Sequence, residues 1–277
     1  MTWQTVGFDK IKKLFEGALS GDTLNHAYLF SGQEMIGKRT FAYELAGGPG
    51  PNVLLVDPVS SQSGETIGID EIRRVKNFLS LTPHSSRYKF VIINDAHLMT
   101  EEAQNALLKV LEEPSASSIL ILVTASPDLL LSTIISRCQG IEFPPHPREL
   151  VVAALERARL TPAQKELLTK LANGRVGLVR DIVGGDLFGE LEQAVRELTS
   201  LAKADLEDRF AYAYKMSDEK RLSETKKKVL YWTLYARTRL TEPRVANILR
   251  NLLTLESALN RPQYNHRLAL EKFFVSI

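Results

Sequence analysis

The residues from Gly32 to Lys38 have the types and spacing of a loop that binds phosphate. They follow an apolar run and precede a segment with helical periodicity. In such a setting the backbone N–H groups between Gly32 and Gly37, together with the helix N-terminus, can surround a phosphate, and Lys38 can neutralise its charge. The next residue should be Ser or Thr to hold Mg²⁺, but it is Arg39. Thr40 comes one position late and, on a helix, points about 100° away.

A second nucleotide-binding element, an apolar strand that ends in Asp-Glu, is also incomplete. In ATPases the Asp organises Mg²⁺ and the Glu positions the attacking water. Here the apolar run 90–93 is followed by Asn94 and Asp95. An amide lacks the charge that a hard cation favours, and Asp95 is one methylene shorter than the usual base. If Asp95 is the metal ligand instead, Ala96 stands where the base should be, so both alignments leave the hydrolytic pair incomplete.

Composition excludes several other kinds of site. Cys138 is the single cysteine, so neither an internal disulfide nor a cysteine-based zinc cluster can form. The formal net charge is +2, from 35 basic and 33 acidic residues, which argues against a dedicated nucleic-acid grip. The densest basic stretch, 226–228, lies in a helix-like segment, and we interpret it as a solvated helix face. Any DNA contact is expected to be shared with other chains.

The apolar residues are distributed as in a soluble protein. Of the 277 residues, 44% are hydrophobic and 25% are charged. No stretch approaches the roughly 18 apolar residues that a membrane span needs, and the first 20 residues contain no uninterrupted apolar core. We therefore expect a cytoplasmic location. The length predicts two or three domains.

Short apolar runs alternate with longer segments of helical periodicity in the first half of the chain. This alternation predicts an α/β fold, in which helices connect the strands of a parallel sheet. The expected strands are 27–31, 53–57, 89–94, 119–124 and 140–143. The expected helices between them cover 38–46, 69–79 and 103–111.

Three prolines in four residues, at 144, 145 and 147, mark the expected end of the α/β domain because proline disrupts helices and lacks a backbone donor. Beyond them the periodicity is helical. Thr161 and Pro162 are typical of a helix start, and Gly174 of a helix end. We expect a sheet domain over 1–145, a small domain of three helices (148–159, 162–173 and 176–183) over 146–186 that ends near Gly184 and Gly185, and a helical bundle over 187–277.

Four blocks of sequence carry a family likeness. They are 26–32 (HAYLFSG), 103–114 (AQNALLKVLEEP), 136–138 (SRC) and 265–271 (NHRLALE). In composition, order and spacing they closely resemble the AAA+ clamp-loader subunits of bacterial DNA polymerase III, over nearly the whole chain. The resemblance implies an AAA+ P-loop domain, followed by a small helical lid and an all-α collar bundle.

The resemblance also implies partners. The collar would join a heteropentamer that contains motor subunits of the gamma/tau type and a delta subunit. The sliding clamp and primer–template DNA would be contacted through the assembled complex, and no membrane would be involved.

Within this family the Ser-Arg-Cys block carries an arginine finger, which reaches across a subunit boundary to the ATP of the neighbour. Arg137 occupies that position. A guanidinium suits the task because it is permanently charged and can bind phosphate oxygens in a bidentate manner. The resemblance therefore predicts that Arg137 is a catalytic residue that acts in trans.

The resemblance assigns two further nucleotide contacts. Thr124 occupies the position of the γ-phosphate sensor. The sensor arginine of the lid belongs just after Gly174, but Gly177 appears there, and Arg175 or Arg180 would face another direction because each is offset. The candidate nucleotide site is therefore degenerate, and its residues are Gly32, Gly37, Lys38, Thr40, Asp95 and Thr124.

Cofactor requirements follow from what the motifs lack. Many relatives of the stator type carry a four-cysteine zinc module after the P-loop helix, but this chain runs from Ala46 into the next strand without a cysteine. We therefore expect no zinc and no other metal site. The incomplete nucleotide motifs predict that no cofactor is required, and they leave open whether ATP with Mg²⁺ occupies the loop.

Three functions fit these observations. In the first, which the departures at Arg39, Asn94 and Gly177 favour, the chain is a stator of the clamp loader with little or no ATPase activity that supplies Arg137 to a neighbouring ATPase. In the second, it is an active motor subunit of the gamma/tau type. In the third, it is an unrelated P-loop NTPase or adaptor, which leaves the C-terminal block unexplained.

Overall fold

The chain forms two compact units. The computed structural model describes residues 3–61, 64–84, 86–156, 158, 160–184, 187–218, 221–239, 243–261 and 264–277. Unit 1 comprises Met1–Val59, Glu65–Leu150 and Gly174–Gly177, and unit 2 comprises Ser60–Gly64, Val151–Asn173 and Leu178–Ile277. The expected junction at Gly185 lies outside the described residues, and the division into three domains at residues 145 and 186 stays a prediction.

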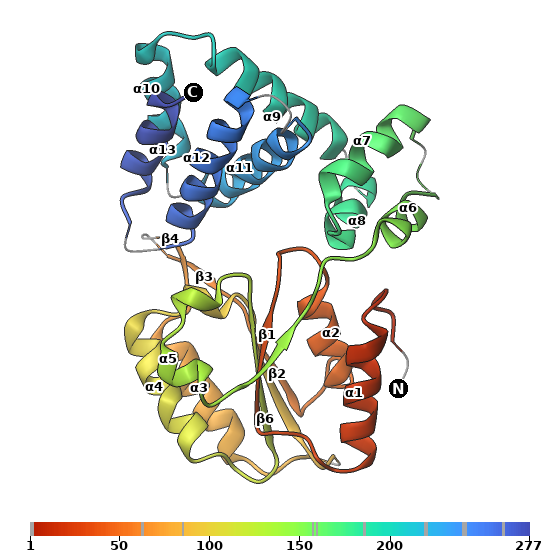
Figure 1. Cartoon of the computed structure of the whole chain (residues 1–277). Coiled ribbons are helices and arrows are strands. Elements are labelled where there is room, and N and C mark those ends of the chain that lie inside the picture. The colour runs from red at the N-terminus through yellow and green to blue at the C-terminus, as the bar shows by residue number, and fades with distance from the viewer. Residues whose placement is uncertain are drawn as a thin grey trace. The chain divides into compact units, whose positions relative to one another are not determined.

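Unit 1 is built on a sheet of five parallel strands in the order β2-β5-β6-β1-β7 (Figure 1). The strands are β1 (Ala27–Ser31), β2 (Val53–Val56), β5 (Lys89–Ile93), β6 (Ser118–Thr124) and β7 (Gln139–Glu142). The parallel α/β prediction is confirmed, with every strand end within one residue of its expected place. A separate pair, β3 (Val59–Ser61) and β4 (Gly64–Thr66), is not predicted by the apolar pattern.

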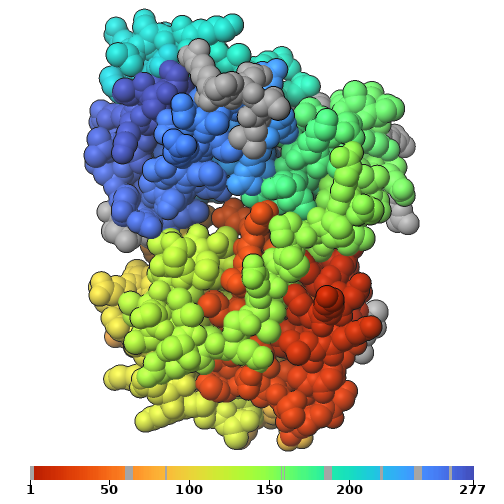
Figure 2. Space-filling model, viewed as in Figure 1, coloured from red at the N-terminus to blue at the C-terminus, as the bar shows by residue number. Residues whose placement is uncertain are grey.

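Helices cover both faces of this sheet, with α1 and α2 on one face and α3, α4 and α5 on the other (Figure 1). Their bounds are α1 (Asp9–Ser20), α2 (Lys38–Leu45), α3 (Ile69–Ser80), α4 (Glu101–Glu112) and α5 (Ser132–Ile135), with short turns η1 (Ala96–Leu98) and η2 (Pro127–Leu129). On the face that Figure 2 shows, the red N-terminal segment and the yellow to green segment share the surface of the unit.

Four phenylalanines fill the space between the sheet and helices α1 and α2. Phe15, Phe30, Phe41 and Phe143 are each at most 1% exposed. The ring centroids of Phe30 and Phe41 are 6.0 Å apart, and those of Phe41 and Phe143 are 5.2 Å apart. Aromatic pairs in such tilted arrangements contribute about 0.5–1.5 kcal/mol beyond the burial of their area. This cluster fixes helix α2, which begins at Lys38, against β1.

Aliphatic side chains fill the opposite face of the sheet. Val91 and Ile93 of β5 pack in one cluster with Ile72 and Val75 of α3 and Leu107 of α4, all of them fully buried. Because helices cover both faces, the central strands are apolar almost throughout instead of alternating with polar residues. The packed sheet thus supports the loops at the carboxyl and amino ends of its strands.

The chain after residue 147 is helical. Its helices are α6 (Arg148–Glu156), α7 (Pro162–Ala172), α8 (Val176–Gly184), α9 (Leu187–Leu201), α10 (Leu206–Met216), α11 (Leu222–Arg237), α12 (Pro243–Leu259) and α13 (His266–Val275). The predicted start of α7 is confirmed, because the hydroxyl of Thr161 accepts the N–H of Gln164 at 3.3 Å and Pro162 is the first helical residue. In the part of the chain that the structure describes, no helix is both long and apolar enough to cross a membrane.

Trp232 of α11 lies at the centre of unit 2. It is 0% exposed, its indole N–H donates to the carbonyl of Ala194 in α9 at 2.7 Å, and its ring stacks on Phe273 of α13. One side chain therefore joins three helices. Its indole nitrogen is hydrogen-bonded, as a buried polar group requires.

Arg209 of α10 connects the ends of two helices. Its guanidinium donates to the backbone carbonyls of Ala202, Ala204, Phe274 and Ile277 at distances of 2.7–3.1 Å. These carbonyls follow α9 or belong to the end of α13, where helices leave carbonyls without a partner in the helix. Arg209 thus donates hydrogen bonds to carbonyls just after the end of α9 and at the end of α13.

Replacing Arg209 by Met should lower the free energy of unfolding of unit 2 by about 2–3 kcal/mol, because charged hydrogen bonds are lost and carbonyls are left unpaired. Urea unfolding followed by the fluorescence of Trp232, in a Trp3→Phe background, measures this. Arg196→Met is the matched control, because the Arg196 side chain is 78% exposed and pairs only across one helix turn with Glu192. It should change stability by less than about 0.5 kcal/mol. Equal losses in the two variants would contradict the role of Arg209.

Candidate nucleotide site and trans-acting arginine

The loops that follow β1, β5 and β6 emerge at one edge of the sheet in unit 1. Ser31 of β1 is in register with Thr124 of β6, and Ile93 of β5 with Leu122 of β6. Because the strands are parallel, their carboxyl ends meet at this edge, which is where open α/β sheets bind ligands. The structure therefore gathers there the loop 32–38, Asp95 and Thr124.

The side chain of Lys38 is bound within the loop itself. Its Nζ donates to the carbonyl oxygens of Gly32 at 2.7 Å and Gln33 at 2.6 Å, and the residue is buried. A P-loop lysine that binds nucleotide directs its ammonium group to the phosphates. Here the same group satisfies carbonyls of the loop.

Two further loop carbonyls accept hydrogen bonds from other parts of unit 1. Met35 O accepts the backbone N–H of Gly177 at 2.7 Å. The Nε2 atom of His146 lies 2.9 Å from Ile36 O and must be the donor, since a carbonyl oxygen only accepts. The loop is therefore held by groups that lie more than 100 residues away in the sequence.

Two glycines allow this close packing. A Cβ atom at Gly177 would lie 2.4 Å from Met35 O, so no side chain fits there without a shift of the backbone. This is the position predicted for the sensor arginine of the lid. Gly32 has a φ of +141°, which favours glycine, and a Cβ atom there would lie 2.4 Å from Phe143 O.

Burial lowers the pKa of Lys38 from 10.5 to about 8. The carboxylates of Glu34 and Asp95 oppose this shift because they stabilise the charged amine, and the guanidinium of Arg175 reinforces it. Arg175 is itself buried. Its charge acts on Lys38, and the expectation that its offset turns the Arg175 side chain away from the site stays a prediction.

The residues at the expected magnesium positions have other partners. Arg39 Nη2 forms an ion pair with Asp57 Oδ2 at 2.7 Å, and Thr40 is exposed. The side-chain amide of Asn94 donates to Asp95 Oδ2 at 2.9 Å. Within the described ranges, no group of three or more His, Cys, Asp or Glu side chains is placed to hold a metal ion.

Thr124, the predicted γ-phosphate sensor, is fully buried. Its hydroxyl oxygen accepts the N–H of Ser126 at 3.0 Å and lies 3.2 Å from Nδ1 of His97. The sequence analysis missed His97, whose signal is its place two residues after Asp95, where the apolar strand has ended. The Thr124–His97 contact links the carboxyl ends of β5 and β6.

Arg137, the predicted finger, is partly exposed just after α5. Its Nη2 forms an ion pair with Glu112 Oε1 at 2.9 Å, and its Nη1 donates to the carbonyl of Thr133 at 2.9 Å. The sequence analysis did not identify Glu112 as a partner of this arginine. Burial raises the pKa of the neighbouring Cys138 thiol to about 12, so that thiol is unreactive at neutral pH.

Arg137 lies at the edge of the sheet opposite to the loop 32–38. It comes two residues before Gln139, the first residue of β7, which pairs with Tyr28 near the amino end of β1. Gly32 follows the carboxyl end of the same strand. Four residues of extended strand span about 13 Å, which is longer than an arginine side chain. Arg137 therefore does not reach the loop of its own chain.

Gln104 is a third polar residue whose role was not predicted from the sequence. It is buried on the otherwise apolar face of α4. Its side-chain oxygen accepts the N–H of Leu131 at 2.8 Å, and its amide donates to Met99 O and Leu129 O. Gln104 thus connects α4 to the segment that leads into α5 and Arg137.

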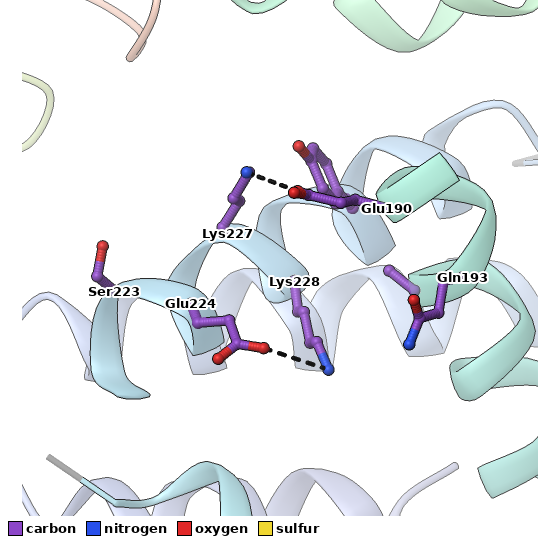
Figure 3. Close-up of a pocket in the computed structure, with 8 residues that line it drawn as sticks. Glu190, Gln193, Ser223, Glu224, Lys227 and Lys228 are labelled. Carbon is purple, nitrogen blue, oxygen red and sulfur yellow. Dashed lines mark ion pairs between the residues drawn. The ribbon is translucent and has the colours of Figure 1, made fainter. Parts of the chain in front are cut away.

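Two lysines of the basic stretch 226–228, Lys227 and Lys228, line a cleft of about 410 Å³ between α9 and α11 of unit 2 (Figure 3). Lys227 pairs with Glu190 at 2.6 Å, and Lys228 pairs with Glu197 at 2.9 Å. The interpretation of this stretch as a solvated helix face is therefore incomplete, because two of its lysines join α11 to α9. The cleft contains none of the predicted site residues.

Comparisons with known proteins agree with the motifs. Residues 48–147 match a family model described as DNA polymerase III, delta subunit. The chain is 31% identical over 212 residues to DNA polymerase III subunit delta′ of Bacillus subtilis, covering 68% of this chain and 63% of that protein. It is 37% identical over 123 residues to subunit delta′ of Escherichia coli, covering 44% of this chain and 36% of that protein. These matches support a place for the chain in the clamp-loader subunit family of DNA polymerase III.

Other members of that family are also similar to this chain. Subunit tau of Bacillus subtilis is 31% identical over 194 residues, covering 61% of this chain and 34% of that protein. The chain thus spans less than two thirds of the length of these curated relatives. A gamma subunit-related protein of Thermotoga maritima aligns with 96% of this chain and 97% of its own, with a TM-score of 0.52 and 20% identity. That likeness concerns the fold, and the predicted AAA+ architecture is confirmed.

Lys38 is expected to titrate near pH 8. Its pKa is lower in the folded than in the unfolded chain, so between about pH 8 and 10.5 the unfolded chain binds more protons. The stability of unit 1 should therefore rise with pH across this window, and Lys38→Met should remove that rise. Cε chemical shifts give the titration, and urea unfolding at several pH values gives the slope.

A matched variant checks the cause of this shift. Asp95→Asn removes a carboxylate that raises the pKa of Lys38, so it should move the titration of Lys38 to still lower pH. A titration of Lys38 near its ordinary value of 10.5 in the native chain would refute the buried position of the amine.

Gly177→Ala should loosen the loop, because the added methyl group collides with Met35 O and weakens the Gly177–Met35 hydrogen bond. Overpacking of this kind costs about 1–3 kcal/mol. Hydrogen exchange of the amides of 33–38 should become faster. Gly17→Ala in α1 is the control, because nothing lies within 4 Å of the added atom. If exchange in the loop stays unchanged in Gly177→Ala, the contact does not hold the loop.

Proposed function

We propose that the chain is a delta′-like stator subunit of the clamp loader, which supplies Arg137 to the ATP of a neighbouring ATPase subunit. The observation that carries this proposal is the place of Arg137. Its guanidinium is partly exposed at the sheet edge opposite to the chain's own phosphate loop, so a phosphate that it binds belongs to another chain. The delta′ relatives in two bacteria support the same assignment.

The state of the chain's own loop supports a role without ATP hydrolysis. Lys38 donates to the loop carbonyls, Arg39 replaces the magnesium-binding hydroxyl, and Asn94 replaces a carboxylate. A chain of this kind can fold and assemble with the loop empty. We infer that the subunit requires neither ATP with Mg²⁺ nor zinc of its own.

The chemistry expected of Arg137 is charge stabilisation. Phosphoryl transfer spreads negative charge over the γ-phosphate oxygens in the transition state, and a guanidinium from a neighbour can bind two of them. Such fingers accelerate nucleotide hydrolysis by about 10³- to 10⁵-fold at the site that they complete. In this proposal, ATP draws Arg137 onto its γ-phosphate and fixes the interface in a state that opens the sliding clamp. DNA entry then triggers hydrolysis and release.

The proposed partners follow from the family. The helices of unit 2 that follow residue 187 would form the collar that joins a heteropentamer with gamma/tau-type motor subunits and a delta subunit. The sliding clamp and primer–template DNA would be reached through this complex. The near-neutral charge of +2 fits a subunit that shares its DNA contacts with other chains.

An active motor subunit is the second candidate, and the similarity to subunit tau of Bacillus subtilis favours it. This function requires Lys38 to leave the loop carbonyls and Asp95 to hold Mg²⁺ without a neighbouring acidic base. ATP turnover by the isolated chain distinguishes it from the stator.

Arg137→Ala should leave the subunit folded and incorporated in the loader but lower the DNA-dependent ATPase activity. Because other ATP sites of the complex keep their own arginines, we expect the total rate to fall by about twofold or more. Steady-state ATP hydrolysis by a reconstituted loader, with clamp and primed DNA, measures the effect.

Two further variants show whether the effect belongs to the finger. Arg137→Lys keeps the charge but loses the bidentate geometry, so it should also be impaired. Arg73→Ala removes a more exposed arginine that pairs only with Asp70 and should not change turnover. Full ATPase activity in the loader that carries Arg137→Ala would rule out the stator function.

A further inference from the structure

The proposed finger, Arg137, forms an ion pair with Glu112. Glu112 Oε1 accepts from Nη2 of Arg137 at 2.9 Å, while Nη1 donates to the carbonyl of Thr133 at 2.9 Å. The two side chains are 37% and 50% exposed, for Arg137 and Glu112 respectively, so a ligand from outside can approach the pair. Nη1 of the guanidinium is thus hydrogen-bonded to the backbone, and Nη2 is paired with a carboxylate.

The position of Glu112 on its helix suggests that the pair is not incidental. Glu112 is the last residue of α4, where the helix dipole disfavours an acidic side chain. The acids that the dipole favours, Glu101 and Glu102, lie in the first turn. The positive charge of Arg137 offsets the unfavourable position of Glu112. The neighbouring Glu113 is exposed and does not take part in this ion pair.

The carboxylate of Glu112 and a phosphate would compete for the same nitrogen. An exposed ion pair changes an equilibrium by about fivefold or less, so the Glu112–Arg137 pair is easily exchanged. A γ-phosphate carries more charge and offers several oxygens, which favours it over one carboxylate. The hydrogen bond from Nη1 to Thr133 O does not involve Nη2, so an exchange of the partner at Nη2 need not disturb it.

We propose that Glu112 is a positioning residue that holds Arg137 within the free subunit and releases it to the phosphate of a neighbour's ATP. The inference rests on the proposed trans action of Arg137 and adds its regulation. Glu112 keeps the guanidinium extended and neutralised before assembly, and its competition sets the ATP concentration at which the interface closes.

The isolated chain tests the contact without any assumption about function. Nitrogen-15 spectra of the Arg137 side chain should change in Glu112→Gln, which removes the charge but keeps the shape, and should stay unchanged in Glu113→Gln. If both variants leave the Arg137 resonances unchanged, the ion pair does not exist in solution and the inference fails.

The assembled loader tests the competition. With Glu112→Gln, the half-saturating ATP concentration of the DNA-dependent ATPase should fall by about twofold to fivefold, because a competing anion is lost. The half-saturating ATP concentration should change, and the maximal rate should not. Glu113→Gln should match the native loader. An unchanged or higher half-saturating concentration, or a loss confined to the maximal rate, would overturn the proposed competition.

A double variant distinguishes the proposed trans action of Arg137 from its proposed regulation by Glu112. If Glu112 acts through Arg137, Glu112→Gln should have no further effect in a loader that carries Arg137→Ala. If Arg137→Ala alone lowers turnover while Glu112→Gln leaves the half-saturating concentration unchanged, the stator function stands and the regulation by Glu112 is wrong. If Arg137→Ala has no effect, the trans action and this inference fail together.

Discussion

The loop 32–38 is held in place by hydrogen bonds to its own backbone carbonyls. Lys38, Gly177 and His146 supply the donors, and the last two come from segments that follow the sheet in sequence. Each bond contributes only about 0.5–1.5 kcal/mol net, but together they fix the start of α2 and the segment 174–177 in one unit. Residues of the expected phosphate-binding loop therefore take part in hydrogen bonds that stabilise the fold.

The same parallel sheet separates the two features that an ATPase ring needs. Its carboxyl edge carries the loop, and its amino edge carries Arg137, so Arg137 does not reach the loop of its own chain. An AAA+ chain can therefore lose the chemistry at one edge while the other edge remains competent to act on a neighbour. Gln104 joins α4 to the segment before Arg137.

Much of unit 1 could be predicted because its signals are local. Apolar runs gave the strand ends to within one residue. In unit 2, the cap at Thr161 likewise gave the start of α7. The order of the strands and the pairing of Arg137 with Glu112 depend on contacts between distant residues, which periodicity does not record. Gln104 gave a weak signal, as a polar residue on an apolar helix face. Helical offset did not indicate that Arg175, which precedes α8, is buried.

The central claim is that the chain acts on another subunit's ATP and has no working nucleotide site of its own. Equilibrium binding of ATP to the isolated chain, with and without Mg²⁺, tests this most directly. The account predicts no saturable binding below about 1 mM and no turnover, because four loop carbonyls and the ammonium group of Lys38 are already paired. Magnesium-dependent binding at micromolar concentrations, with measurable hydrolysis, would contradict it.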